Sequence, residues 1–99
     1  MIFTGAVFEI KGLTEIDSIT DRFKPEFWFF QLVNDTWYLV TVEESFDCVL
    51  VRNSFAELIA FEDKVKAKLP EYEIIGSMFI TNKPIVDYKE LIEDIINVD

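Results

Sequence analysis

Residues 27–52 constrain the fold more than any other part of the chain, because the strands they can form are apolar on both faces. The segment reads FWFFQLV, then Asn34 and Asp35, then TWYLVTVEES and FDCVLVR. Asn and Asp tolerate a left-handed backbone, so Asn34-Asp35 is predicted to be a two-residue hairpin turn. This turn sets the register of the flanking strands and places Val33 opposite Thr36, Leu32 opposite Trp37 and Phe30 opposite Leu39.

Both faces of this hairpin consist mainly of large side chains, because side chains alternate along a strand. One face carries Trp28, Phe30, Leu32, Trp37 and Leu39. The other carries Phe27, Phe29, Gln31, Val33, Tyr38, Val40 and Val42. Leaving about six such residues in water would forgo roughly 10 kcal/mol, which is comparable to the stability of a small domain. We therefore expect helices to cover one face and further protein to cover the other.

A third strand is predicted at Phe46–Arg52, after a turn at 43–45. In this arrangement Cys48 and Leu50 join the face that carries the tryptophans. Cys48 is the only cysteine, so no internal disulfide can form, and its apolar position favours a core residue over a reactive thiol. The single cysteine and the lack of a signal-peptide pattern predict a cytoplasmic protein.

The remaining elements follow from periodicity and from the residues that start and stop them. Residues 1–11 read as a strand, in which Gly5 marks a bulge or a close backbone approach. Three segments combine helical spacing with a capping residue at the start: 14–24, 54–69 and 87–98. Residues 71–81 read as another strand.

The predicted order of elements is therefore β-α-β-β-β-α-β-α. It indicates the α+β class, as a two-layer sandwich in which two or three helices back a mostly antiparallel sheet of four or five strands. Apart from one extra strand and the last helix, this order resembles the split βαββαβ arrangement. The 99 residues suffice for one core, so residues 1–99 are expected to form a single domain.

The composition is strongly acidic, which restricts the classes of partner. The chain has 19 acidic and 9 basic residues, no histidine and a net charge of −10. Such a charge repels nucleic acids and anionic membranes and favours a protein partner with a basic surface. Keeping an aromatic-rich domain soluble is the simpler explanation of the same charge. No apolar run is long enough to span a bilayer.

Two groups of residues suggest nucleic-acid or phosphate binding, and the charge argues against both. Trp28, Phe30 and Trp37 could stack on bases, but this mode of binding needs a basic groove. Lys64, Lys66 and Lys68 lie near the end of the predicted helix 54–69, where they complement the helix dipole. We therefore expect core packing for most of the aromatic residues and a structural role for the lysines.

No catalytic, cofactor-binding or metal-binding motif is recognisable. Without histidine, neither a Cys–His nor a Ser–His nucleophile can be built within this chain. Three glycines leave no phosphate-cradling loop. Glu15 with Asp17, or the acids within 43–47, could hold a divalent cation weakly, but exposed turn acids are the simpler interpretation. We expect no enzyme activity, no cofactor and no metal.

The favoured hypothesis is a small acidic protein-binding module: an inhibitor, immunity or anti-defence factor that occupies a basic site on a target protein. The net charge, the small size and the lack of catalytic groups motivate this hypothesis. In its sharpest form, the acids imitate the phosphate spacing of a nucleic acid. The predicted contact residues are Asp35, Trp37, Glu43, Glu44, Asp47, Glu90, Glu93 and Asp94.

Two alternatives stay open. The chain is a self-associating structural or regulatory domain if the surplus apolar sheet face forms a homodimer interface, since obligate interfaces resemble a core cut in half. It is a small-ligand carrier or a carboxylate-based enzyme if a pocket between sheet and helices has acids at its mouth. Light scattering tests the first alternative, and a deep cleft around an acid with a strongly raised pKa would support the second.

Overall fold

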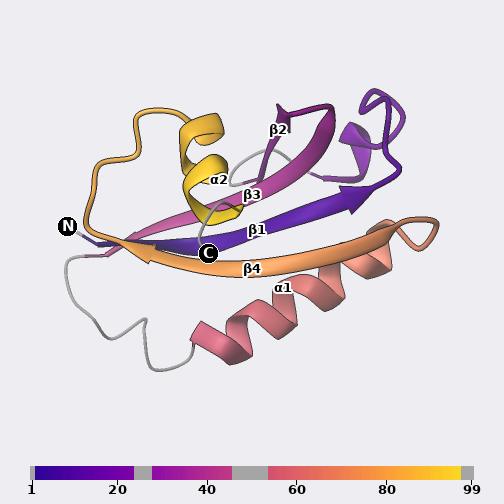
Figure 1. Ribbon diagram of the computed structural model, residues 1–99. Coiled ribbons are helices and arrows are strands. Elements are labelled where there is room, and N and C mark those ends of the chain that lie inside the picture. The colour runs from indigo at the N-terminus through magenta and orange to yellow at the C-terminus, as the bar shows by residue number, and fades with distance from the viewer. Residues whose placement is uncertain (1, 24–27, 46–53, 97–99) are drawn as a thin grey trace.

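In the computed structural model, a four-stranded antiparallel sheet carries a helix on each face (Figure 1). The structure describes residues 2–23, 28–45 and 54–96. The elements are β1 (Ile2–Lys11), the 3-10 turn η1 (Thr20–Arg22), β2 (Trp28–Val33), β3 (Thr36–Ser45), α1 (Ser54–Lys68), β4 (Glu73–Thr81) and α2 (Tyr88–Ile96). The strand order across the sheet is β2-β3-β1-β4. The predicted α+β class and antiparallel sheet are confirmed.

The hairpin of β2 and β3 has the predicted register. Val33 pairs with Thr36, Leu32 with Trp37 and Phe30 with Leu39. Asn34 and Asp35 have φ angles of 50° and 63°, the left-handed conformation that a type I′ turn requires. Because the chemistry of the turn decides this register, the local sequence is sufficient to predict it.

β3 is a central strand, paired with β2 on one edge and with β1 on the other, which contradicts the predicted turn at 43–45. Residues 43–45, predicted as a turn, continue β3 and pair with β1, Glu43 with Thr4 and Ser45 with Ile2. β1 thereby occupies the edge of β3 that a strand at 46–52 would need. The predicted turn and the pairing through it are wrong, and residues 46–53, with Cys48, lie outside the described residues.

Gly5 of β1 lies against the backbone of β3 at Thr41. A Cβ atom at this position would lie 1.9 Å from the carbonyl oxygen of Thr41. No residue with a side chain fits there without displacing a strand. The close backbone approach predicted at Gly5 is confirmed.

Residues 12–23 form a loop with the turn η1, so the helix predicted at 14–24 is wrong over its described residues. Ile19 and Phe23, whose spacing suggested the helix, are nevertheless buried in the core. A segment this short forms too few helical hydrogen bonds to offset the cost of helix nucleation. Packing of its apolar side chains therefore decides its conformation. The resemblance to the split βαββαβ arrangement is borne out in the sheet, because β3 lies between β1 and β2, and β1 lies between β3 and β4, which α1 connects. Its first helix is wrong, because no α-helix joins β1 to β2 among the described residues.

Polar contacts tie this loop to the end of α1. Arg22 Nη1 donates a hydrogen bond to the carbonyl oxygen of Lys68 at 3.1 Å and pairs with the carboxylate of Glu71. Lys68 Nζ donates to the carbonyl oxygen of Arg22 at 2.7 Å and lies 5.5 Å from the centre of the Phe23 ring. The hydrogen bond from Arg22 lowers the pKa of Glu71 below its ordinary value. Lys68 therefore has a structural role.

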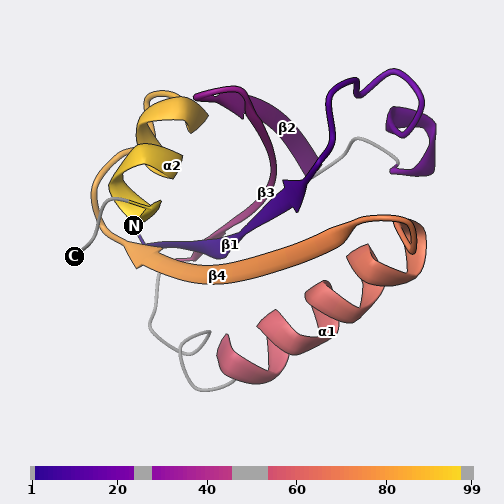
Figure 2. The ribbon, with the colours of Figure 1, turned by 45° about the vertical axis from the view of Figure 1, so that its right-hand side comes forward.

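Each face of the sheet buries its own apolar cluster, so the molecule has three layers. The cluster under α1 contains Ala6, Phe8, Ile10, Leu13, Ile19, Phe23, Trp28, Leu39, Val65, Leu69 and Ile74. The cluster under α2 contains Val7, Val33, Tyr38, Val40, Phe79, Leu91 and Ile92. Figure 2 shows the two helices on opposite sides of the sheet. The predicted two-layer sandwich is wrong, because α2 covers the face that was expected to need another protein.

Trp28 is the centre of an aromatic group on the α1 face. Its ring lies 6.3 Å from that of Phe8, 5.8 Å from Phe23 and 5.7 Å from Phe61. Such tilted and edge-on pairs each contribute about 0.5–1.5 kcal/mol beyond area burial. Phe30 joins the group through Phe23, with ring centres 5.7 Å apart. Trp28 and Phe30 therefore serve the core and form no exposed stacking platform.

Candidate functional site

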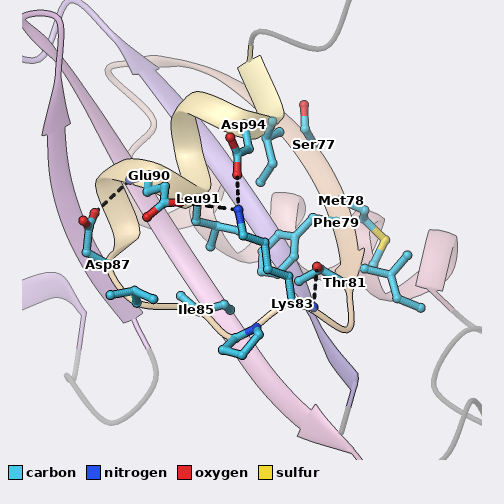
Figure 3. Close-up of a pocket in the computed structure, with 14 residues that line it drawn as sticks. Ser77, Met78, Phe79, Thr81, Lys83, Ile85, Asp87, Glu90, Leu91 and Asp94 are labelled. Carbon is cyan, nitrogen blue, oxygen red and sulfur yellow. Dashed lines mark hydrogen bonds and ion pairs between the residues drawn. The ribbon is translucent and has the colours of Figure 1, made fainter.

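A groove with a volume of about 480 Å³ lies between the edge strand β4, the loop 82–87 and helix α2 (Figure 3). β4 contributes residues 77–81, the loop contributes residues 83–87, and α2 contributes Glu90, Leu91, Asp94 and Ile95. We name this hollow the β4–α2 groove. Its volume falls within the range of about 300–1,000 Å³ that is typical of binding pockets.

The floor of the β4–α2 groove is apolar. Phe79 and Leu91 are buried members of the cluster under α2, and Ile85 and Ile95 pack against that cluster from the side. Val86 stands at the rim with 82% of its surface exposed. An exposed apolar rim next to an apolar floor is typical of a binding surface, because leaving apolar side chains in water is unfavourable.

The rim on the α2 side is acidic. Glu90 and Asp94 are four residues apart on α2, so their side chains lie on the same face of the helix. Lys83 bridges them, with its Nζ atom 3.4 Å from Glu90 Oε1 and 3.8 Å from Asp94 Oδ2. Figure 3 shows the Lys83 side chain reaching from the loop to both carboxylates. The two acids thus hold one cation at the mouth of the groove.

Local sequence signals position these side chains. The backbone N–H of Lys83 donates to Thr81 Oγ1 at 3.0 Å, which turns the chain directly after β4. Asp87 caps α2, because its Oδ1 atom accepts a hydrogen bond from the backbone N–H of Glu90 at 2.8 Å. This cap agrees with the start predicted for the helix 87–98. The cap determines where α2 begins, and the burial of Leu91 and Ile92 against the sheet leaves Glu90 and Asp94 on the side of the loop.

A smaller hollow of about 170 Å³ continues the groove toward the other end of β4. It is lined by Val7, Glu9, Tyr38, Ile75, Ser77, Ile95 and Ile96, and it shares Ser77 and Ile95 with the first hollow. Ile75 and Ile96 at its margin are 43% and 40% exposed. Together the two hollows follow β4 from Thr81 to Ile75, which is about 20 Å of strand.

Two tyrosines lie on the α2 side of the sheet. Burial raises the pKa of Tyr88 above its ordinary value of 10.0. Burial also raises the pKa of Tyr38, and the negative charge of Glu9 raises it further. The ring of Tyr88 stacks on that of Phe29, with ring centres 4.6 Å apart. Both phenols therefore stay protonated at pH 7, and the Tyr88 ring anchors the start of α2 on β2.

The contact residues predicted from the sequence do not form one surface. Asp35 lies in the turn of the β2–β3 hairpin. Trp37, two residues further on, is partly buried against the cluster under α1. These two residues are at the end of the sheet far from the loop 82–87. Asp47 lies outside the described residues.

Glu43 and Glu44 lie at the opposite end of β3 from Asp35, about 30 Å along an extended strand. Glu44 pairs with Phe3, and so does Thr81 of β4. The backbone of these two acids is therefore at the groove end of the sheet, with β1 between them and β4.

On α2, the three predicted acids have different partners. Glu90 and Asp94 line the groove and hold Lys83. Glu93 instead faces Lys89, whose Nζ atom lies 4.0 Å from Glu93 Oε1. The structure thus brings two of the eight predicted contact residues together with the groove.

The sequence interpretation missed the loop that completes the groove. Ile85 and Val86 stand between Pro84 and the cap residue Asp87, where a turn would ordinarily be polar. This pair of apolar loop residues was the available signal. Nothing in the linear sequence places Lys83 beside α2, because that contact depends on where the helix lies on the sheet.

Within residues 2–23, 28–45 and 54–96, no group of three or more His, Cys, Asp or Glu side chains is placed to hold a metal ion. No helix in that part of the chain is long and apolar enough to cross a membrane. In the lysine cluster of α1, Lys66 pairs with Glu62 at 3.3 Å and Lys68 binds the Arg22 carbonyl, so both support the fold.

Comparisons of the chain with protein-family models, with curated proteins and with solved structures find no match. A function for the β4–α2 groove must therefore be argued from its own residues. These are the apolar floor, the acidic rim and the strand edge beside them.

Proposed function

We propose that this protein is a small acidic binding module that occupies a basic site on a target protein. The β4–α2 groove is the observation that carries this proposal. Its apolar floor can bury a partner's side chains, and the carboxylates of Asp87, Glu90 and Asp94 at its edge favour a cationic partner. The net charge of −10 acts in the same direction at long range, because it steers a basic partner toward the molecule.

Inhibitor, immunity and anti-defence factors belong to this class, since each acts by occupying a site on its target. Nucleic-acid mimicry is a narrower form of the proposal. It requires a target surface that contacts both ends of β3, because Asp35 and Glu44 are about 30 Å apart. The groove supports the broader form, in which one end of the molecule and its edge strand make the contact.

A small-ligand carrier is the second candidate, and the groove volume of about 480 Å³ favours it. A carrier usually encloses its ligand, whereas this groove is continued by a second hollow and bordered by the exposed residues Ile75, Val86 and Ile96. A surface of this shape suits a macromolecular partner better, because a compact ligand would leave much of it uncovered.

The test is an affinity capture from the native host with three immobilised proteins. They are the wild type, the variant Glu90→Gln with Asp94→Asn, and the control Glu62→Gln, which alters an acid of an ion pair on α1. We expect a protein with a basic surface to bind the wild type and the control, to be lost from the double variant, and to elute between about 50 and 500 mM salt.

Circular dichroism of all three proteins checks that the substitutions leave the fold intact. Purified partner and isothermal titration calorimetry then confirm a direct contact. Equal capture by the double variant, or retention that is insensitive to salt, would contradict recognition of a basic site through this groove.

A further inference from the structure

We infer that the target contributes an extended basic segment, which adds to β4 as a fifth strand and places an arginine or lysine between Glu90 and Asp94, where Lys83 now lies. This inference rests on the proposed function and specifies how the β4–α2 groove recognises its partner. Three observations carry it: the edge position of β4, the length of the groove, and the position of Lys83.

β4 is an edge strand of the sheet. Among the described residues it pairs with β1 alone, so the backbone N–H and C=O groups of alternate residues point away from the sheet. Ile75 and Ile80 on this strand are 43% and 54% exposed, and no proline interrupts it. An edge of this kind is a template for strand addition, in which main-chain hydrogen bonds give affinity and side-chain pockets give specificity.

The shape of the hollow fits an extended occupant. The first hollow runs beside β4 from Thr81 to Ser77, and the second shares Ser77 and Ile95 with it, reaches Ile75 of β4 and extends inward over Val7 and Glu9 of β1 and Tyr38 of β3. A strand of about six or seven residues spans the length from Thr81 to Ile75. Every second side chain of that strand would point toward α2, onto Phe79 and Ile95. A helix or a compact ligand would fill one hollow and leave the strand edge unpaired.

Lys83 shows that the two carboxylates are spaced to accept one cation. Its Nζ atom is 3.4 Å from Glu90 and 3.8 Å from Asp94, both longer than the roughly 2.7–2.9 Å of a strong charge-assisted hydrogen bond. The Lys83 side chain is also 65% exposed. An incoming arginine could form two parallel hydrogen bonds with one of these carboxylates, so we expect it to displace Lys83. Lys83 therefore acts as an internal competitor for the site.

Charge selects a basic segment over a second copy of this chain. Pairing of two β4 strands would place two acidic copies side by side, each with Asp87, Glu90 and Asp94 at its rim. The net charge of each copy, −10, adds further repulsion. A basic segment is attracted both by the acidic rim at short range and by the net charge at long range. Dimerisation through β4 remains an outcome that the experiment can detect.

The experiment uses a library of random linear peptides displayed on phage and selected against the intact protein. We expect enriched peptides to alternate apolar and other residues and to contain arginine or lysine. A synthetic copy of the most enriched peptide should perturb the amide NMR signals of residues 75–81 and 83–95, and leave those of α1 unchanged. N-methylation of the peptide backbone on the side that pairs with β4 should abolish binding, because it removes the hydrogen bonds of strand addition.

Matched variants test the role of Lys83. Lys83→Gln should raise the affinity for the peptide by about two- to fivefold, the range expected when an exposed ion pair no longer competes. Lys66→Gln removes the same charge from an ion pair on α1 and should change the affinity little. Glu90→Gln with Asp94→Asn should lower the affinity at least about tenfold.

Several outcomes would overturn the inference: no enriched peptide, enriched peptides without basic residues, NMR changes confined to α1 or the hairpin turn, or binding that survives N-methylation. A dimer that pairs through β4 in solution would also overturn it. The affinity capture is read separately. A basic partner that depends on Glu90 and Asp94, together with failure of the peptide tests, would retain the proposed function and reject strand addition.

Discussion

The two faces of the sheet are covered by helices of different length, and this difference determines where the molecule keeps an accessible surface. α1 has 15 residues and runs beside β4 in both views (Figure 1), whereas α2 has 9 residues and begins against β2. Under α1, Trp28 and its aromatic neighbours fill the core. Beside α2, the margin of β4 stays uncovered and becomes a groove. One apolar sheet thus supports a closed core on one side and a binding surface on the other.

The largest contrast is expected in stability. Phe8→Ala on the α1 face should cost about 3–5 kcal/mol, because it leaves a large cavity around a fully buried side chain. Ile95→Ala on the groove side should cost only about 1 kcal/mol, because this side chain is partly exposed already. Urea unfolding with a check of the m-value measures both free energies. If the two variants lost the same free energy of unfolding, both faces would be closed cores and the groove would not be an accessible surface.

A second test compares the hairpin end of the sheet with the groove end. Asp35→Gly should stabilise the protein by about 0.5–1 kcal/mol, because glycine removes the strain of a left-handed residue at φ 63°. The same variant should capture the basic partner as well as the wild type does. Thermal unfolding measures the first effect and the affinity capture the second. A loss of capture would move the contact surface from the groove to the hairpin end.

Acid should weaken the α1 side. The hydrogen bond from Arg22 lowers the pKa of Glu71 below 4.5, so the stabilisation it provides is present above that pH and is lost as the pH falls through the lowered value. The stability difference between wild type and Glu71→Gln should therefore shrink on acidification. Urea unfolding at a series of pH values measures this difference. A gap that is the same at every pH would show that the ion pair contributes nothing through its charge.

Alkali should produce the smallest effect, on the α2 side. The folded state holds the phenol protons of Tyr38 and Tyr88 more tightly than the unfolded state, whose tyrosines have a pKa of about 10. Stability should therefore fall as the pH rises above about 10. Tyr88→Phe should flatten part of this decline, and tyrosinate absorbance should report late ionisation in the wild type. If stability declined equally in the double variant Tyr38→Phe with Tyr88→Phe, other groups would cause the decline above pH 10.

Features that depend on neighbouring residues could be predicted from the sequence. The hairpin register follows from Asn34-Asp35, and the face on which Trp28 and Leu39 lie follows from strand alternation. The cap of α2 at Asp87 and the pair of Glu62 with Lys66 follow from spacing along a helix. Each needs only the geometry of a single element or turn.

The wrong predictions concern contacts between segments that are distant in the sequence. The apolar character of 46–52 was consistent with a strand beside β3, but β1 occupies that edge. Ile16, Ile19 and Phe23 have helical spacing, yet packing against the core holds them in a loop. Eight contact residues were predicted, mainly from charge, and among those whose side chains the structure describes, Glu90 and Asp94 alone line the groove. Charge patterns cannot show which acids share a surface.

The sequence by itself determined that both faces of the β2–β3 hairpin need cover, because leaving so many large apolar side chains in water would cost too much free energy. Only the tertiary structure decided what buries them. α2 packs on the second face of the sheet, and β1 pairs with the edge of β3. Lys83 contacts Glu90 and Asp94 because the sheet determines where α2 lies. These arrangements depend on how all segments of the chain compete for the same strand edges and sheet faces, which cannot be predicted from any one segment alone.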